Sequence, residues 1–298
     1  MKNRRTADPA PGKGASGRKI RRDHTRQKLA VFGILLAALL LAAAFSTYLC
    51  PYDPYAQDLS VSSQAPGAAH LLGTDQFGRD MLSRVIAGSR TSIYSAVAVV
   101  AAVTVTGTAV GLFCGYMGGW IDTVLMRISD IFLAFPGLVF ALAVAGVLGG
   151  GIWSAVIALA AIGWPKYARI ARSETLAQKE QTYLMAAKLS GCSAGKLIYR
   201  HILPNIAGQI LVTAVLDVGT MMMEIAGLSF LGLGAKPPMA EWGSMMSDGR
   251  SMLQTTPWVI LAPGAAIFIS VAIFNLFGDT LRDYLDPKRV RDQGYEGE

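Results

Sequence analysis

Three long stretches without a single charged residue dominate the sequence. They cover residues 91–121, 131–165 and 255–278 and are 31, 35 and 24 residues long. A transmembrane helix needs only about 20 consecutive apolar residues. Charged residues make up 16% of the chain, whereas a soluble domain carries about 25%. A backbone in lipid must satisfy its own hydrogen bonds, so we expect an all-α polytopic membrane protein and exclude an ordinary soluble enzyme.

Six membrane-spanning helices are expected. The first follows a basic stretch and is longer than the apolar core of a signal peptide, so it is interpreted as a retained helix. Pro136 should bend the third span, and the glycines at 149–151 should end it. The six predicted spans are residues 29–50, 93–117, 121–148, 152–171, 206–230 and 257–277.

The distribution of lysine and arginine predicts how the chain is oriented, because these residues concentrate on the cytoplasmic side. With the N-terminus inside, the inner segments hold 22 basic residues and the outer segments hold five. We therefore expect both termini to be cytoplasmic. Because the basic residues flank membrane spans instead of covering a soluble face, a nucleic-acid-binding protein is excluded.

One long connection, residues 51–92, is predicted to lie outside the membrane. Its glycines permit tight turns, and Thr74 or Asp75 should cap a short amphipathic helix. This helix is expected from Arg79 onward, on the membrane surface. The loop is interpreted either as a structured exterior cap or as a ligand-contacting surface. The motif that draws attention within it consists of Gly73, Thr74, Asp75, Gly78, Arg79 and Asp80.

The second long connection, residues 172–205, is predicted to be cytoplasmic and mostly helical. Gly191 should join two short helices, and Pro204 should kink the chain where the fifth span begins. Such a pair would form a compact knob with Ala186 and Ala187 on a small-residue face, suited to docking into a groove of another protein. An amphipathic loop resting on lipid is the alternative interpretation.

Two acidic residues, Asp217 and Glu224, lie seven positions apart within the fifth span and so share one face. A charge at this depth is costly and should face a pore or a partner. It would either attract a cation on a pathway or form a structural pair. Met221 and Met222 nearby are soft donors or adaptable packing residues. The three histidines are scattered, so no metal site is expected.

The predicted knob resembles the coupling loop of inner-membrane permease subunits of ABC importers. Met185 stands where that family usually has Glu, which removes one possible charged contact with an ATPase. The exterior motif and the ends of the last two spans look like the second permease subunit of dipeptide, oligopeptide and nickel importers. The coupling-loop residues that carry the resemblance are Met185, Ala186, Ala187, Gly191, Ile202, Leu203 and Pro204.

The resemblance implies a type I ABC importer permease fold in a bacterial inner membrane, surrounded by lipid. This chain and a homologous second permease would form the pore, an extracytoplasmic binding protein would deliver substrate, and two cytoplasmic ATPases would use ATP and magnesium. The chain itself would be non-catalytic and bind no cofactor, in line with the absence of a phosphate loop from the sequence. Residues 188–191 and 216–219 favour nickel or a metal chelate as cargo, with a di- or oligopeptide as the alternative.

Functions of two other classes, an enzyme and an autonomous transporter, are the alternatives to a permease subunit. An intramembrane hydrolase needs a nucleophile and a base within the spans, and the spans contain no histidine. An autonomous channel or secondary transporter would work without ATPases. The expected organisation is a disordered basic tail (1–28), a first transmembrane helix (29–50), an exterior loop (51–92), a transmembrane core (93–278) containing the coupling loop (172–205), and a cytoplasmic C-terminal tail (279–298).

Overall fold

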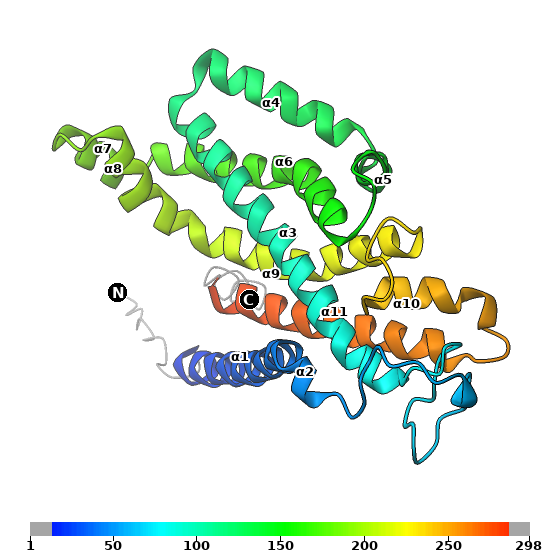
Figure 1. The fold of residues 1–298 in the computed structure, drawn as a ribbon. Helices are drawn as coiled ribbons and strands as arrows, with labels where there is room; N and C mark the ends of the chain where they lie inside the picture. The colour runs from blue at the N-terminus through cyan, green and yellow to red at the C-terminus, as the bar shows by residue number, and fades with distance from the viewer. Residues whose placement is uncertain (1–13, 286–298) are drawn as a thin grey trace, which may run out of the picture.

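The protein is described by a computed structural model that covers residues 14–285, and its regular structure there is helical (Figure 1). One isolated antiparallel bridge joins Thr74 and Asp80. The helices are α1 (Gly14–Ala44), α2 (Ser46–Leu49), η1 (Leu59–Val61), α3 (Met81–Met117), α4 (Gly119–Ala134), α5 (Gly137–Val147), α6 (Ile152–Lys179), α7 (Thr182–Leu189), α8 (Ala194–Leu197), the π-helical η2 (Ile198–Ile202), α9 (Leu203–Phe230), α10 (Trp242–Gly249), η3 (Arg250–Met252) and α11 (Trp258–Leu285).

Four helical segments are long and apolar enough to cross a membrane, which confirms an all-α polytopic protein. The bent pair α4–α5 makes a fifth candidate. Helix α6 is long enough, but basic residues interrupt its apolar sequence, so the structure supports four to five candidate spans where the sequence predicts six. The four segments are Thr25–Ala44, Met81–Met117, Ala194–Phe230 and Trp258–Leu285.

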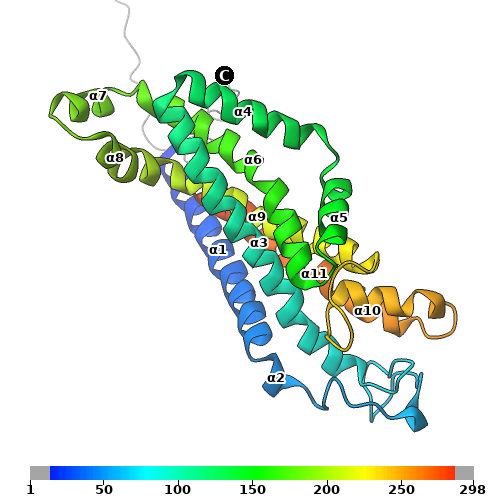
Figure 2. The same cartoon turned by 45° about the horizontal axis from the view of Figure 1, so that its top comes forward.

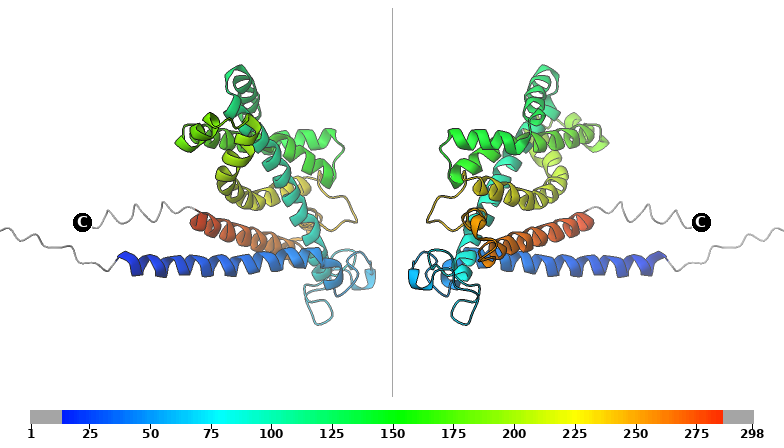
Figure 3. Two further views of the ribbon diagram at one scale, coloured as in Figure 1. Left: turned by 90° about the vertical axis from the view of Figure 1, so that its left-hand side faces the viewer. Right: turned by 90° about the vertical axis from the view of Figure 1, so that its right-hand side faces the viewer.

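The helices are arranged around α3, which packs along α6 and crosses α9 (Figures 1 and 2). Helix α1 lies beside α11 (Figure 3). A stripe of glycines, Gly107, Gly111 and Gly115, forms the α3 side of the contact with α6. A methyl group on Gly107 or Gly111 would overlap a backbone oxygen of α6. Small residues at this spacing let two membrane helices approach closely.

Helix α3 differs from the prediction because it is one continuous helix of 37 residues from Met81. The short surface helix expected from Arg79 is instead the first turns of α3. Asp80 caps this helix, since its Oδ2 accepts a hydrogen bond of 2.8 Å from the Ser83 N–H. At about 1.5 Å per residue α3 is roughly 55 Å long, so it extends well beyond a hydrocarbon layer of about 30 Å.

The expected bend at Pro136 is present but much sharper than a kink. Helices α4 and α5 meet at 92°, because Phe135 before the proline adopts an extended conformation with ψ of 145°. The predicted break after α5 is also present. Gly149, Gly150 and Gly151 have φ values of +81°, +66° and +102°, which side-chain-bearing residues rarely adopt.

The predicted N-terminal tail is helical in part. Helix α1 begins at Gly14, so residues 14–28 are helical where a disordered tail is expected. No proline or glycine lies in residues 18–28, which favours helix there. Helix α11 continues to Leu285, and the cytoplasmic location of the C-terminal tail stays a prediction. The rest of both predicted tails, 1–13 and 286–298, lies outside the described residues.

The contact between α3 and α6 gives a direct test of the fold. Gly111→Leu should destabilise the protein by about 3 kcal/mol, because the new side chain overlaps the Ala168 backbone and forces the helices apart. Gly146→Leu is the matched control, since no atom lies within 4 Å of a Cβ at that position. Thermal unfolding followed by tryptophan fluorescence measures both. Equal midpoints for the two variants would show that the glycine contact is unimportant.

Candidate functional site

Helices α7 and α8 form a knob, residues 182–197, that projects from one end of the bundle (Figures 1 and 2). Gly191 follows the end of α7 with φ of +82°. The Cys192 N–H donates to the Ala187 carbonyl at 3.2 Å, which closes the turn. A left-handed glycine after a helix is a common way to satisfy its last carbonyl groups. The two short helices predicted on either side of Gly191 are therefore present.

The knob is attached firmly to the helices on both sides of it. Leu184 and Leu197 are buried in the core. The Tyr183 hydroxyl donates to Gln178 of α6 at 2.6 Å and accepts from Asn205 of α9 at 3.0 Å. One side chain of α7 thus connects α6 to α9.

The outer surface of the knob is exposed and carries apolar side chains beside two lysines, Lys188 and Lys196. Leu189 is 90% exposed and Tyr199, just beyond the knob, is 76% exposed. Met185 and Ala186 are also exposed, whereas Ala187 packs partly against the core. Helix α7 lies outside the candidate spans, whereas α8 and Tyr199 lie within the candidate span Ala194–Phe230. Exposed apolar side chains gathered at one place mark a contact surface.

At the kink expected at Pro204 the helix is not broken, and it continues from α8 through η2 into α9. The Leu203 N–H donates to the Ile198 carbonyl, five residues earlier. This π-helical turn directly precedes Pro204, which has no N–H to donate. Ile202 is buried, Leu203 is half-buried and Pro204 is exposed. The loop motif at 202–204 therefore starts α9 without a break.

Asp217 on α9 is buried and holds two partners on α6. Its Oδ1 lies 2.6 Å from Lys166 Nζ, and its Oδ2 accepts from the Tyr167 hydroxyl at 2.9 Å. Of the two interpretations made from the sequence, this geometry supports the structural ion pair. Glu224 lies two turns further along α9 and is half-buried.

The two methionines predicted beside these acids pack against the protein core. Met222 is buried, and Met221 is partly buried against the same cluster of apolar side chains. Among residues 14–285 no group of three His, Cys, Asp or Glu side chains could hold a metal ion. These contacts support adaptable packing by both methionines.

Three basic residues of α6, namely Lys166, Arg169 and Arg172, have a role that the sequence did not reveal. From the sequence they count only as basic residues near the inner end of a span, and the structure shows that each pairs with an acidic residue. Arg172 makes two hydrogen bonds to Asp122 of α4, at 2.5 and 2.6 Å. Arg169 pairs with Asp130, also on α4. The regular spacing of three along an otherwise apolar helix is the signal that could have identified them.

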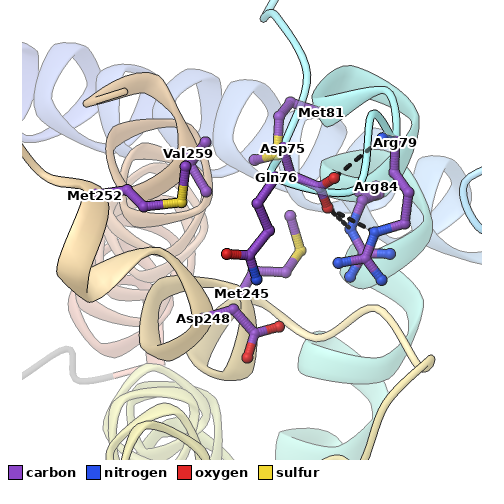
Figure 4. A pocket seen from close by; sticks show the side chains of 9 residues that line it. All are labelled: Asp75, Gln76, Arg79, Met81, Arg84, Met245, Asp248, Met252 and Val259. Atoms are coloured by element: carbon purple, nitrogen blue, oxygen red, sulfur yellow. Dashed lines mark hydrogen bonds and ion pairs between the residues drawn. The ribbon is translucent and has the colours of Figure 1, made fainter. Parts of the chain in front are cut away.

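The opposite end of the bundle is closed by the loop before α3, residues 51–80, which we term the cap (Figure 2). Asp75 is its centre. One carboxylate oxygen accepts from the Phe77 and Arg79 N–H groups, at 2.9 and 3.0 Å. The other oxygen lies 2.6 Å from Arg79 Nε and 3.6 Å from Arg84 Nε (Figure 4). Both guanidinium groups are buried, so Asp75 compensates two positive charges.

A small pocket beside these groups is lined by Asp248 and three methionines (Figure 4). Partial burial raises the pKa of Asp248, while Arg79 and Arg84 act to lower it. The pocket brings α10 against the start of α3. This places the 231–257 connection beside the cap.

The remaining motif residues of the cap also serve the fold. The Thr74 hydroxyl donates to the Val61 carbonyl at 2.5 Å, and the Thr74 carbonyl accepts from Trp258 of α11 at 3.1 Å. Gly73 and Gly78 both have φ of +72°, and a Cβ on Gly78 would overlap a neighbouring carbonyl. Asp80, not Thr74 or Asp75, caps the helix. These contacts support the structured-cap interpretation.

Comparison with known proteins identifies the type of transport component. Residues 107–291 match the family described as binding-protein-dependent transport system inner membrane component. Residues 17–66 match the N-terminal transmembrane domain of oligopeptide transport permease C. The fold is similar to a chain of the inward-facing methionine ABC transporter MetNI, with a TM-score of 0.57 at 16% identity, covering 69% of this chain and 98% of that one.

Relatives with different named substrates match the chain equally well. It is 42% identical to the dipeptide transport system permease protein DppC of Alkalihalophilus pseudofirmus, covering 88% of this chain and 87% of the relative. It is 42% identical to the glutathione permease GsiD of Pectobacterium atrosepticum (91% of each). It is 41% identical to the nickel permease NikC of Escherichia coli (88% and 95%). No substrate branch is favoured, and the chain belongs to the DppC-type permeases of the binding-protein-dependent transport system inner membrane component family.

Proposed function

We propose that this chain forms half of the translocation pore of an ATP-driven importer, together with a homologous second permease. The knob would dock into one of two cytoplasmic ATPases, and an extracytoplasmic binding protein would deliver the cargo. Permease components of this family are non-catalytic and bind no cofactor themselves, so ATP and magnesium would be used by the ATPases. The observation that carries the proposal is the exposed apolar knob tied to both α6 and α9.

We further propose six spans with both termini in the cytoplasm. Helix α6 would be the additional span, because its basic residues in the inner half are compensated by Asp217, Asp130 and Asp122. A paired charge is far less costly in a membrane than an isolated one. Helix α10 contacts the cap, which supports the same exterior side for the cap and for the 231–257 connection. The knob lies at the other end of the bundle, which supports a cytoplasmic position for it.

Movement of the knob would change the access of the pore from one side to the other, by rocking of packed helices. Asp217, Glu224, Met221 and Met222 stay predicted pathway residues. Burial of Asp217 and the packing of Met221 and Met222 against the core support structural roles for these three, so Glu224 is the better candidate for contact with cargo.

For the cargo we propose nickel or a metal chelate first and a di- or oligopeptide second. The first choice is supported by the resemblance of residues 188–191 and 216–219 to nickel permeases. The second is supported by dipeptide and glutathione relatives of equal identity. A metal cargo would cross as a chelate or a transient guest, since the described residues hold no metal-ligand cluster.

The docking role of the knob is tested by Leu189→Glu. A charge at this 90% exposed position should leave the fold intact but disrupt an apolar contact, so the yield of ATPases that co-purify with the tagged chain should fall about tenfold. Leu59→Glu is the matched control, because Leu59 is 72% exposed in the cap. Undiminished co-purification with Leu189→Glu would refute docking through this face.

The cargo is tested by deleting the gene and measuring two phenotypes in the same strain. Nickel accumulation should fall while growth on peptides is unchanged, because the binding protein and pore would serve the metal cargo. Complementation with the intact gene is the control. Unchanged nickel accumulation together with lost growth on peptides would overturn the first choice and establish the second.

A further inference from the structure

A pocket of about 500 Å³ lies away from the knob and the cap, between three helices. It is bounded by the end of α1, the outer part of α3 and the start of α6, with Met239 of the α9–α10 connection at its edge. This volume is in the range of pockets that hold small organic molecules. The proposed pore and coupling surface account for none of its lining residues.

The lining changes from polar to apolar along the helix axes. Arg90 and Thr91 lie at the point where the charge-free run of α3 begins. Ala98 lies about two helical turns further along α3, and Val156 about one turn into α6. A ligand that fits this gradient has a charged head and an apolar tail, aligned with the membrane normal.

Arg90 supplies the charge. It is exposed, and no carboxylate in the part of the chain with described side chains forms an ion pair with it. By contrast, Arg79 and Arg84 are both compensated by Asp75. A guanidinium group binds phosphate through paired, charge-assisted hydrogen bonds. The free cation at the rim therefore favours an anionic head group.

Two aromatic residues place the pocket at a membrane surface. Trp153 is 72% exposed at the start of α6, and Tyr94 is 38% exposed on α3. Tryptophan and tyrosine concentrate at the level of lipid head groups. Helix α1 ends at the same place, and only 6% of its apolar window is buried within the chain. The Tyr94 hydroxyl also donates to the Leu40 carbonyl of α1 at 3.0 Å, so a ligand here would lie beside a direct contact of α1 with α3.

We propose that this pocket binds one anionic phospholipid, with its phosphate on Arg90 and its acyl chains against Ala98 and Val156. A lipid is favoured over free phosphate because most of the lining is apolar. A water-soluble cargo is disfavoured for the same reason. The bound lipid would add to the contact of α1 with α3 that the Tyr94 hydrogen bond already makes.

The test uses the importer complex purified through a tag on this chain, delipidated in mild detergent, and then given phosphatidylglycerol or phosphatidylcholine. Native mass spectrometry counts the bound lipids. The wild type should retain one molecule of phosphatidylglycerol. The affinity of Arg90→Gln for this lipid should be about tenfold lower, because a charge-assisted contact is lost. Arg250→Gln is the matched control, since Arg250 is also exposed and lies outside the pocket.

A second variant and a second anion distinguish the remaining outcomes. Ala98→Trp should block the pocket and abolish retention while Arg90 is still present, with thermal midpoint and monodispersity confirming the fold. Inorganic phosphate with phosphatidylcholine should not replace phosphatidylglycerol. Equal retention by Arg90→Gln and wild type would overturn the proposal. If inorganic phosphate alone displaced phosphatidylglycerol, the pocket would be an anion site and not a lipid site. If Ala98→Trp lost the second permease but still retained phosphatidylglycerol, the pocket would be a subunit interface.

Discussion

The close contact of α3 with α6 connects the two ends of the molecule. Gly107, Gly111 and Gly115 allow the two backbones to approach, and the rest of α6 is positioned by that contact. Helix α6 then reaches α9 through Lys166 and reaches α4 through its arginines. Its last turn is joined to the knob by the bond from Tyr183. Helix α6 therefore touches α3, α9, α4 and the knob, which supports the proposed passage of motion from the knob to the other helices.

The cap and the knob, at opposite ends of the bundle, are stabilised by different contacts. In the cap, Asp75 neutralises two buried guanidinium groups, and left-handed glycines allow the chain to turn without collisions. The charged groups of this end are therefore paired within the chain. Both ends expose apolar side chains, Leu59 and Leu71 in the cap and Leu189 in the knob. The paired charges support a structural role for the cap, and the proposed docking of the knob rests on its position between α6 and α9.

The positions and ends of helices depend on local sequence and could be predicted. Contacts between helices depend on how far the helices slide along each other and could not be predicted. The charge-free runs 91–121 and 255–278 predicted the apolar helices α3 and α11, and Pro136 and Gly191 predicted where helices end. The pairing of Lys166 with Asp217 joins residues about 50 positions apart, and it depends on how far α6 and α9 slide along each other. The sequence predicts Thr74 or Asp75 as the N-terminal capping residue of the helix that follows, because either residue type can take this position. The prediction is wrong, since Asp80 caps α3.

The central claim is that this chain moves cargo only when a partner hydrolyses ATP, and reconstitution tests it most directly. The chain and its homologous permease are placed in vesicles with the binding protein and its bound cargo, with or without the ATPases. We expect accumulation against a gradient only when the ATPases and ATP are both present. Accumulation against a gradient without the ATPases would contradict it and would identify an autonomous transporter.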